Sequence, residues 1–253
     1  MSDTPHRRRL GSALLGIVLL AVACSARADQ DDAALWIVNQ VSVPVSERWS
    51  VNLMTQARII REIGTYERSV VRPWVAVKLP WNFEAAVGYD AHLFENPRSL
   101  LESRGWQRLG YEHDWGRFKT QVHFWQEERF IEGDDEVAWR SRFLVGATVP
   151  LPYSLTGVVR NEFFINLNKT DRIRDLGLGE NQFFAGFRRR VTPWLRVDVG
   201  YLMQFLERPD RDVYNHGLLL GFSITTPSLS SLWNKISRGQ SAFNDSGKCG
   251  DRR

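Results

Sequence analysis

The sequence predicts an all-β protein, an antiparallel up-and-down transmembrane β-barrel of about 10–12 strands. Five times, two runs of alternating apolar and polar residues are joined by a very short turn that carries an aromatic residue, as in VAVKLPWNFEAAVGYDAHLF around Trp81. Many of these runs are about 10–14 residues long, and a tilted strand needs about 9–11 residues to cross a bilayer. Aromatic rings at strand ends suit the boundary between water and lipid.

Alternation along the chain predicts eleven candidate strands. They lie near residues 34–44, 48–61, 68–79, 83–95, 104–114, 118–131, 137–149, 154–168, 181–191, 194–207 and 213–225. The connections alternate between short turns and longer polar loops, which is the asymmetry of an outer-membrane barrel. Single-chain bacterial barrels have even strand numbers, so either the first segment lies partly in the lumen or outside the barrel, or the count is off by one. Loop alternation would start the first strand on the outer side, so we favour a first segment that is not part of the wall, which leaves ten strands. We also expect a bulge at Pro73, because proline removes a ladder hydrogen bond.

The N-terminus reads as a secretory signal peptide over residues 1–28. Three arginines precede an apolar run from Leu10 to Val22, and Ala26 and Ala28 offer small residues for cleavage before Asp29. The alternatives are an uncleaved anchor, lipoprotein processing at Cys24, or twin-arginine export. We favour Sec export and the bacterial outer membrane as the destination. The barrel then takes residues 29–225, and residues 226–253 form a polar tail expected to be disordered or periplasmic.

Composition excludes several classes of protein. The whole chain is +4, but the part after residue 28 holds 29 basic and 28 acidic residues, so its basic character gives no reason to invoke nucleic acid. The two cysteines, Cys24 and Cys249, cannot form a disulfide within the chain once the signal peptide is removed. After that peptide, no apolar run of about 20 residues is available for a transmembrane helix.

Two architectures remain open for the alternating strands. A soluble periplasmic β-barrel that binds a lipophilic ligand would bury the apolar face, whereas a membrane barrel turns that face to lipid and keeps the charges inside. Strand length, loop asymmetry and the signal peptide favour the membrane barrel. The candidate lumen charges are then Arg58, Arg72, Glu84, Asp90, Arg108, Glu112, Arg140, Arg142, Arg160, Glu162, Arg196 and Asp198. We expect them to pair and to leave a narrow, mostly plugged lumen, the alternative being a small selective pore.

No catalytic, cofactor-binding or metal-binding residue is predicted. A membrane-embedded lipid-modifying hydrolase is the rival hypothesis, with His92, His113, His123 and His216 as candidate bases, but no serine lies in a Gly-x-Ser-x-Gly elbow. Residues 112–114, Glu-His-Asp, are adjacent in sequence, and strand geometry splits them between two faces. We therefore predict a protein that is not an enzyme.

The chain resembles a known bacterial family, the domain of unknown function 2490, over about residues 33–225. The resemblance rests on the opening LWIVNQVSVPVSERWSVNL, on the repeated hairpins, and on Gly-aromatic pairs such as Gly88-Tyr89 and Gly200-Tyr201. Members of that family are thought to be outer-membrane β-barrels. The resemblance implies no catalytic residues, and it leaves the role open between an envelope structure and a narrow selective pore.

The last predicted strand carries a sharper local motif. Asn215, Gly217, Leu220 and Phe222 resemble the polar-x-Gly-x-x-apolar-x-aromatic signal by which the barrel-assembly machinery reads last strands. The alternative is a simple amphipathic strand, and the residues that follow the motif depart from the usual terminal position. The expected partners are therefore outer-membrane lipid and the assembly machinery. The sequence does not specify an oligomeric state.

Overall fold

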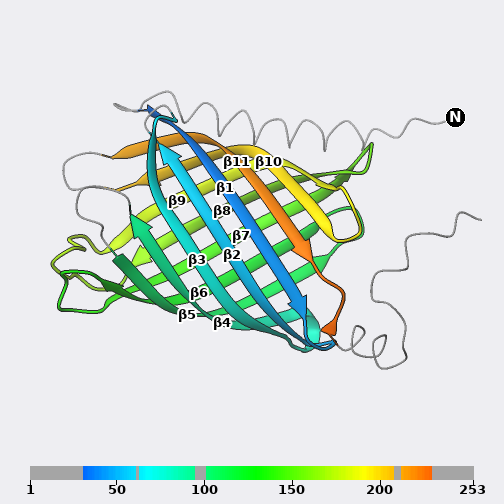
Figure 1. The fold of residues 1–253 in the computed structure, drawn as a ribbon, viewed down its shortest axis with the longest axis horizontal. Helices are drawn as coiled ribbons and strands as arrows, with labels where there is room; N and C mark the ends of the chain where they lie inside the picture. Colours follow the sequence, from blue (N-terminus) through cyan, green and yellow to red (C-terminus); the bar gives the residue numbers. More distant parts are fainter. Residues whose placement is uncertain (1–30, 61–62, 95–100, 208–211, 230–253) are drawn as a thin grey trace, which may run out of the picture.

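The protein forms a closed β-barrel of eleven strands in a computed structural model that describes residues 31–60, 63–94, 101–207 and 212–229 (Figure 1). The strands are β1 (Asp31–Pro44), β2 (Trp49–Ile60), β3 (Thr65–Lys78), β4 (Phe83–Phe94), β5 (Leu101–Asp114), β6 (Lys119–Ile131), β7 (Ala138–Leu151), β8 (Leu155–Asn166), β9 (Gly177–Arg190), β10 (Leu195–Leu206) and β11 (Val213–Thr225). Each strand lies beside its neighbours in sequence. The all-β barrel prediction is therefore confirmed, at eleven strands.

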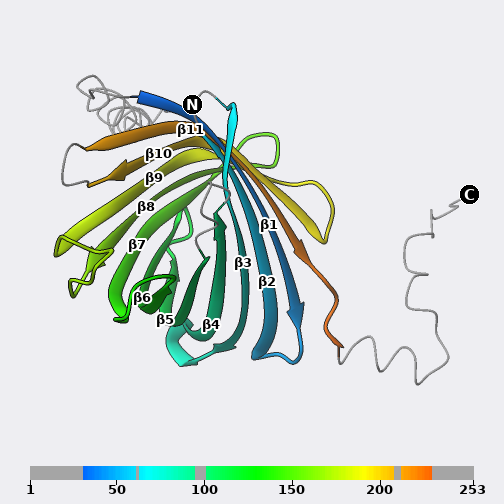
Figure 2. The same cartoon turned by 60° about the vertical axis from the view of Figure 1, so that its left-hand side comes forward.

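The barrel closes between its first and last strands, which run parallel to each other and lie side by side in both views (Figures 1 and 2). The other ten pairings are antiparallel. With an odd number of alternating strands, the first and last point the same way, so they can close only in parallel. The expectation that the first segment lies outside the wall and leaves ten strands is wrong. At this seam a Cβ on Gly217 would lie 2.4 Å from the carbonyl oxygen of Ala34, so the seam needs glycine there.

The connections gather in two sets at opposite ends of the barrel. One end carries the ends of the strands joined by residues 45–48, 79–82, 115–118, 152–154 and 191–194, and the other carries the opposite ends of the strands, with the described connections 132–137 and 167–176. The first set contains the turn aromatics that the sequence singled out, and their side chains project into solvent in the isolated chain. Trp81 and Tyr153 adopt positive φ values of 57° and 61°, which tight reversals require. We call the first end the short-turn end, and the second end, which has the longest connection, the loop end.

β3 passes through Pro73 without the bulge that we expected. Its pairing with β4 keeps one register on both sides of the proline, although Arg72 and Pro73 are paired with no described residue of β4. Proline lacks the N–H group that the ladder needs, so the ladder is interrupted without a shift. The shift of register that β3 does show lies toward β2, between Arg58 and Ile59 of that strand.

The two faces of the wall are inverted relative to a soluble protein. Outward side chains are apolar and exposed, such as Val87 at 60 % and Val199 at 40 %, whereas the inward Asp90 and Glu127 are fully buried. Two apolar clusters also lie inside the barrel, among the charges. One contains Ala34, Trp36, Val158, Phe184, Leu202 and Leu219, and the other contains Ala76, Ala86, Trp106, Trp125 and Leu144. The barrel interior is thus filled by both kinds of side chain.

The predicted signal peptide, residues 1–28, lies outside the described residues. Residues 230–253 of the predicted tail also lie outside them. Among the described residues, no helix is both long and apolar enough to span a membrane.

Candidate functional site

A buried ion-pair network lines the inner face of the wall from β5 to β8, and Glu127 of β6 lies at its centre. Arg140 donates to Glu127 from Nε at 2.8 Å and from Nη2 at 2.6 Å, and Arg142 donates from Nη1 at 2.7 Å. Nη1 of Arg104 lies 3.9 Å from the same carboxylate. Arg142 also donates to Glu162 of β8, at 3.0 Å from Nε and 2.5 Å from Nη2. Alternation along neighbouring strands places these side chains on one face, where the charges compensate each other away from water.

The network extends to the loop end of the barrel through Glu102 of β5. This carboxylate accepts hydrogen bonds from Nε of Arg104 at 2.7 Å and from Nε of Arg129 at 2.6 Å. All three side chains are nearly inaccessible to solvent. Arg104 therefore joins the Glu102 and Glu127 carboxylates into one network that spans β5 to β8.

Asp90 of β4 anchors a second group. Arg72 of β3 donates two hydrogen bonds to the Asp90 carboxylate, from Nε at 2.7 Å and from Nη2 at 2.5 Å. Nε1 of Trp106 donates to the same carboxylate at 2.7 Å, which satisfies the polar atom of a buried ring. A bidentate pair of this kind fixes both side chains, because the guanidinium fork matches the carboxylate.

Two further ion pairs lie nearer the short-turn end. Arg188 of β9 binds Asp198 of β10 in a bidentate pair at 2.7 and 2.8 Å. Arg108 of β5 donates from Nη2 to the carboxylate of Glu84 on β4. Both pairs join adjacent strands, so they stabilise the wall as well as fill the lumen.

The twelve predicted lumen charges all lie on the inward face, and the structure brings eight of them into ion pairs. These eight are Arg72, Glu84, Asp90, Arg108, Arg140, Arg142, Glu162 and Asp198. The other four, Arg58, Glu112, Arg160 and Arg196, make no ion pair with a described residue. Glu112 is exposed near the short-turn end, whereas Arg58 is deeply buried.

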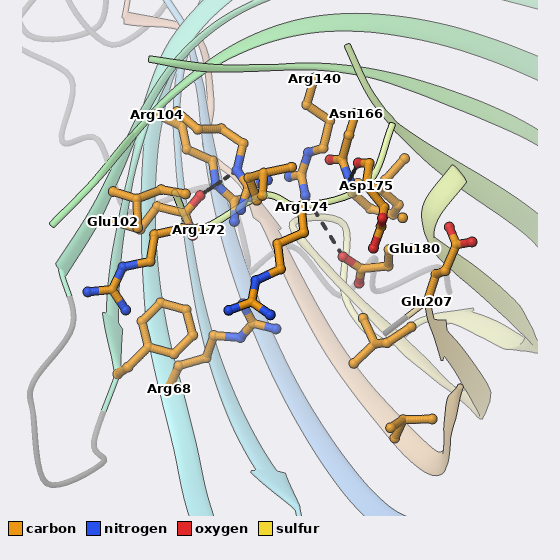
Figure 3. Close-up of a pocket in the computed structure, with 18 of the residues that line it drawn as sticks. Arg68, Glu102, Arg104, Arg140, Asn166, Arg172, Arg174, Asp175, Glu180 and Glu207 are labelled. Atoms are coloured by element: carbon orange, nitrogen blue, oxygen red, sulfur yellow. Dashed lines mark hydrogen bonds and ion pairs between the residues drawn. The ribbon is translucent and has the colours of Figure 1, made fainter. Parts of the chain in front are cut away.

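A wide cavity of about 650 Å³ opens at the loop end, and we call it the mouth cavity. Arg172 and Arg174 come from the connection between β8 and β9, and their side chains point into the cavity together with Arg104 and Glu180 of the wall (Figure 3). The connection is attached to its neighbour by Asp134, whose carboxylate accepts hydrogen bonds from the hydroxyl of Thr170 and from the backbone N–H of Arg172. The hydrogen bond from Thr170 is the main reason that the pKa of Asp134 lies below its ordinary value of 3.8.

A second cavity, of about 310 Å³, lies deeper in the barrel, and we call it the mid-lumen cavity. It shares Arg68, Arg104, Phe164 and Glu180 with the mouth cavity, so the two adjoin. Its lining holds two carboxylates, Glu162 and Glu180, against eight arginines: Arg58, Arg68, Arg72, Arg104, Arg108, Arg142, Arg160 and Arg188. Side chains of both apolar clusters complete the wall, among them Trp36, Trp125 and Phe184.

Sequence reasoning missed part of this interior. It overlooked charges at strand ends, such as Glu102 and Glu180, because the expected strands began at residues 104 and 181, whereas β5 begins at residue 101 and β9 at residue 177. Arg188 was hidden in a run of three arginines. The buried aromatic rings were not predicted either, although Trp106 and Trp125 share the parity of the charges around them. That shared parity is the signal that could have found them.

No group of three or more histidine, cysteine, aspartate or glutamate side chains is arranged for a metal ion within the described parts of the chain. His92 is buried and lies beside Asp90, with Nε2 3.6 Å from the carboxylate, and it lines the mid-lumen cavity. His123 contacts the ring of Trp125 and also lines the mid-lumen cavity.

The predicted assembly segment is the closing strand β11. Asn215 points inward and donates to Gln204 at 3.0 Å, and Gly217 lies against β1. Leu220 and Phe222 point outward, and Phe222 is exposed. The geometry is that of an amphipathic last strand, and its recognition by the assembly machinery stays a prediction.

Comparison with known proteins gives a family. A search of curated proteins and a search of solved structures both find no significant match. A family model described as "Protein of unknown function (DUF2490)" matches residues 33–215, which cover β1 to the start of β11. The expected resemblance is confirmed, and the chain belongs to the DUF2490 family of proteins of unknown function.

Proposed function

We propose that this protein is an outer-membrane β-barrel that serves the cell envelope as a filled, non-enzymatic barrel. The observation that carries the proposal is the inverted wall. Val87 and Val199 face outward and are exposed, while Glu127 and Asp90 are sealed inside. Exposing a whole apolar wall to water would be costly, because each Å² of apolar surface left in water costs about 25 cal/mol. A bilayer removes that cost.

The rims support the same proposal. Trp49, Trp115 and Trp194 lie in or beside the turns of the short-turn end, with about half of each side chain exposed. Tryptophan is enriched where lipid headgroups meet water, since its ring is apolar and its N–H is polar. The soluble alternative, a periplasmic barrel with a lipophilic ligand, would need an apolar interior. The interior here carries the Glu127 network instead.

The filled interior favours an envelope role over general permeation. Arginine and glutamate side chains pair along the inner face of the wall, and two apolar clusters fill further parts of the interior and leave the mouth and mid-lumen cavities between them. A barrel slightly wider than the eight-stranded kind is closed by such side chains. In planar bilayers the protein should therefore give small or rare conductance steps. Large and stable open-channel currents would move transport to first place.

The location is tested by fractionation. The protein should sediment with outer membranes, need detergent for extraction, and migrate differently on gels before and after boiling. A matched check uses Val199→Arg, which puts a charge on the outward face and should lower the yield of folded protein in lipid vesicles. Recovery of the protein in the soluble periplasmic fraction, with no change of mobility on boiling, would reject the proposal.

A further inference from the structure

We propose that the mid-lumen cavity is a binding site for a small organic anion, a carboxylate or phosphate group joined to a compact apolar body. This goes beyond the envelope role, because it assigns a ligand class to a site inside the barrel. The cavity volume of about 310 Å³ lies at the lower end of the range for small-molecule sites.

The first argument is unused hydrogen-bonding capacity at one place. Arg58 is 7 % exposed, and only its Nη2 has a protein partner, Oε1 of Gln56 at 3.2 Å. Its Nε and Nη1 have no partner in the described structure. Buried donors of Trp36, Arg68 and Arg108 are likewise unpartnered, and all four residues line this one cavity. Buried donors without acceptors are destabilising, and more so when they are charged, so their convergence indicates an acceptor-rich occupant.

The second argument is charge. Most arginines of the cavity have a carboxylate of their own, as Arg142 has Glu162 and Arg188 has Asp198. Arg58 and Arg160 have no such ion pair among the described residues. Two guanidiniums without a carboxylate partner in one cavity favour an anion, because a water molecule can accept a hydrogen bond but cannot neutralise the charge.

The third argument is the character of the opposing surface. The guanidinium of Arg58 stacks on the ring of Trp36 at 3.6 Å, and that of Arg160 lies 4.5 Å from the ring of Phe184. Leu202 and Leu219 continue the same apolar wall. Charge and apolar surface therefore meet within one cavity. This arrangement suits a ligand with an acidic group on a compact apolar body, and it suits neither a bare ion nor a long lipid chain.

The approach route is the mouth cavity. It adjoins the mid-lumen cavity, and Arg172 and Arg174 extend into it from the longest connection (Figure 3). Cationic side chains at an entrance raise the local concentration of anions. The route opens at the end of the barrel and not through its wall, so a water-soluble anion is the expected source rather than a lipid headgroup.

The experiment is isothermal titration calorimetry on the mature protein refolded in a zwitterionic detergent, at constant ionic strength and low chloride. The probes are benzoate, inorganic phosphate, and benzamide as the neutral match of benzoate. Benzoate should bind saturably at one site per barrel, phosphate more weakly, and benzamide not at all. An anionic lipid, phosphatidylglycerol added to the detergent, should not compete with benzoate.

The variants assign the site. Arg58→Met should weaken benzoate binding by about tenfold or more, since a charge-assisted hydrogen bond is worth about 1.5–3 kcal/mol. Arg196→Gln removes an inward arginine that does not line the cavity, so it should change the affinity less than about twofold. If Arg58→Met loses its heat-modifiable mobility and is unfolded, Arg160→Met takes its place, with the same expected loss.

Each remaining outcome overturns the inference. Absence of saturable benzoate binding to a barrel that is folded by mobility rejects the site. If Arg58→Met binds benzoate with the same affinity as the unmodified protein, the assignment of the site is rejected. The same holds for Arg160→Met where that variant is used instead. Binding of phosphate without benzoate, or competition by phosphatidylglycerol, rejects the ligand class. The envelope proposal is tested separately by fractionation, so either proposal can fail without the other.

Discussion

Replacing Glu127 by glutamine should destabilise the barrel more than any other single charge removal in the lumen. Glu127 is fully buried and accepts three hydrogen bonds from Arg140 and Arg142, while Arg104 lies within 3.9 Å. The substitution keeps the shape and one acceptor oxygen, but it leaves three guanidiniums without their central charge. Arg142 keeps Glu162 and Arg104 keeps Glu102, but Arg140 keeps only Glu180, whose oxygen lies 3.9 Å away.

The magnitude follows from what the arginines lose. Removing one partner of a buried ion pair costs about 3–5 kcal/mol, because the other charge stays buried. The retained amide oxygen places the expected loss near the lower end, about 3 kcal/mol. With a denaturant dependence of about 1–3 kcal/mol per molar urea, the unfolding midpoint should fall by about 1–3 M.

The assay is equilibrium urea unfolding in detergent, followed by tryptophan fluorescence and by heat-modifiable mobility. Glu112→Gln is the matched control, since Glu112 is on the same face but exposed and makes no ion pair with a described residue. Its free energy of unfolding should fall by no more than the contribution of an exposed charge, about 0–1 kcal/mol. Equal midpoints for the two variants would refute the reasoning that the network is a buried, mutually compensating group.

Three further outcomes are expected. Gly217→Val should reduce the folded yield, because its Cβ would lie 2.4 Å from the carbonyl oxygen of Ala34. The control Gly105→Ala should fold normally, since its Cβ would meet only a flexible side chain at 3.9 Å. Equal folded yields of the two variants would contradict the closed seam. Val199→Arg should lower folding yield in lipid vesicles more than Arg196→Gln does, since a charge at a lipid-facing midplane position costs about 2–4 kcal/mol, and the reverse order would count against the outward assignment. The pKa of Asp134 is lowered in the folded protein, so the carboxylate stabilises the loop above pH 3.8, and this stabilisation is lost as pH falls through the lower folded pKa. Amide exchange of Arg172, corrected for its intrinsic rate, should therefore accelerate below the folded pKa of Asp134. The variant Asp134→Asn should show fast exchange at every pH.

The wall of this barrel could be predicted from sequence because its signal is local. Alternation along β10 identifies Val199 as outward and Arg196 as inward, and the turn aromatics mark where strands end. Closure could not be predicted in the same way. Whether β1 joins β11 depends on contacts between residues that are far apart in sequence, such as Ala34 and Gly217, and no periodicity reports those contacts.

The interior was predictable by residue type but not by pairing. Parity places Arg142 and Glu162 on one face, yet it does not reveal that Arg142 also binds Glu127. Nor does parity distinguish Arg58, which has no carboxylate partner among the described residues, from Arg72, which has one. That distinction depends on the register between neighbouring strands, which places Arg58 opposite Trp36 and Arg68 rather than opposite a carboxylate. It is also the distinction on which the anion site depends.

The apolar cluster that contains Trp36 and the ion network around Glu127 lie against different parts of the wall, whereas the second apolar cluster, with Trp106 and Trp125, lies on β3 to β7 among the charges. Parallel pairing is slightly less stable per residue than antiparallel pairing, and β1–β11 is the one parallel pair. Behind that seam lies the apolar cluster of Trp36, Leu219, Leu202 and Phe184, which tolerates small shifts in strand position. The ion network lies on β5 to β8, where antiparallel ladders hold each arginine to its carboxylate. An ion pair needs precise geometry to offset its desolvation, so it belongs where the backbone is best fixed. Arg58 and Arg160, whose guanidiniums lie on rings of the apolar cluster, are then the cations left over between the two regions.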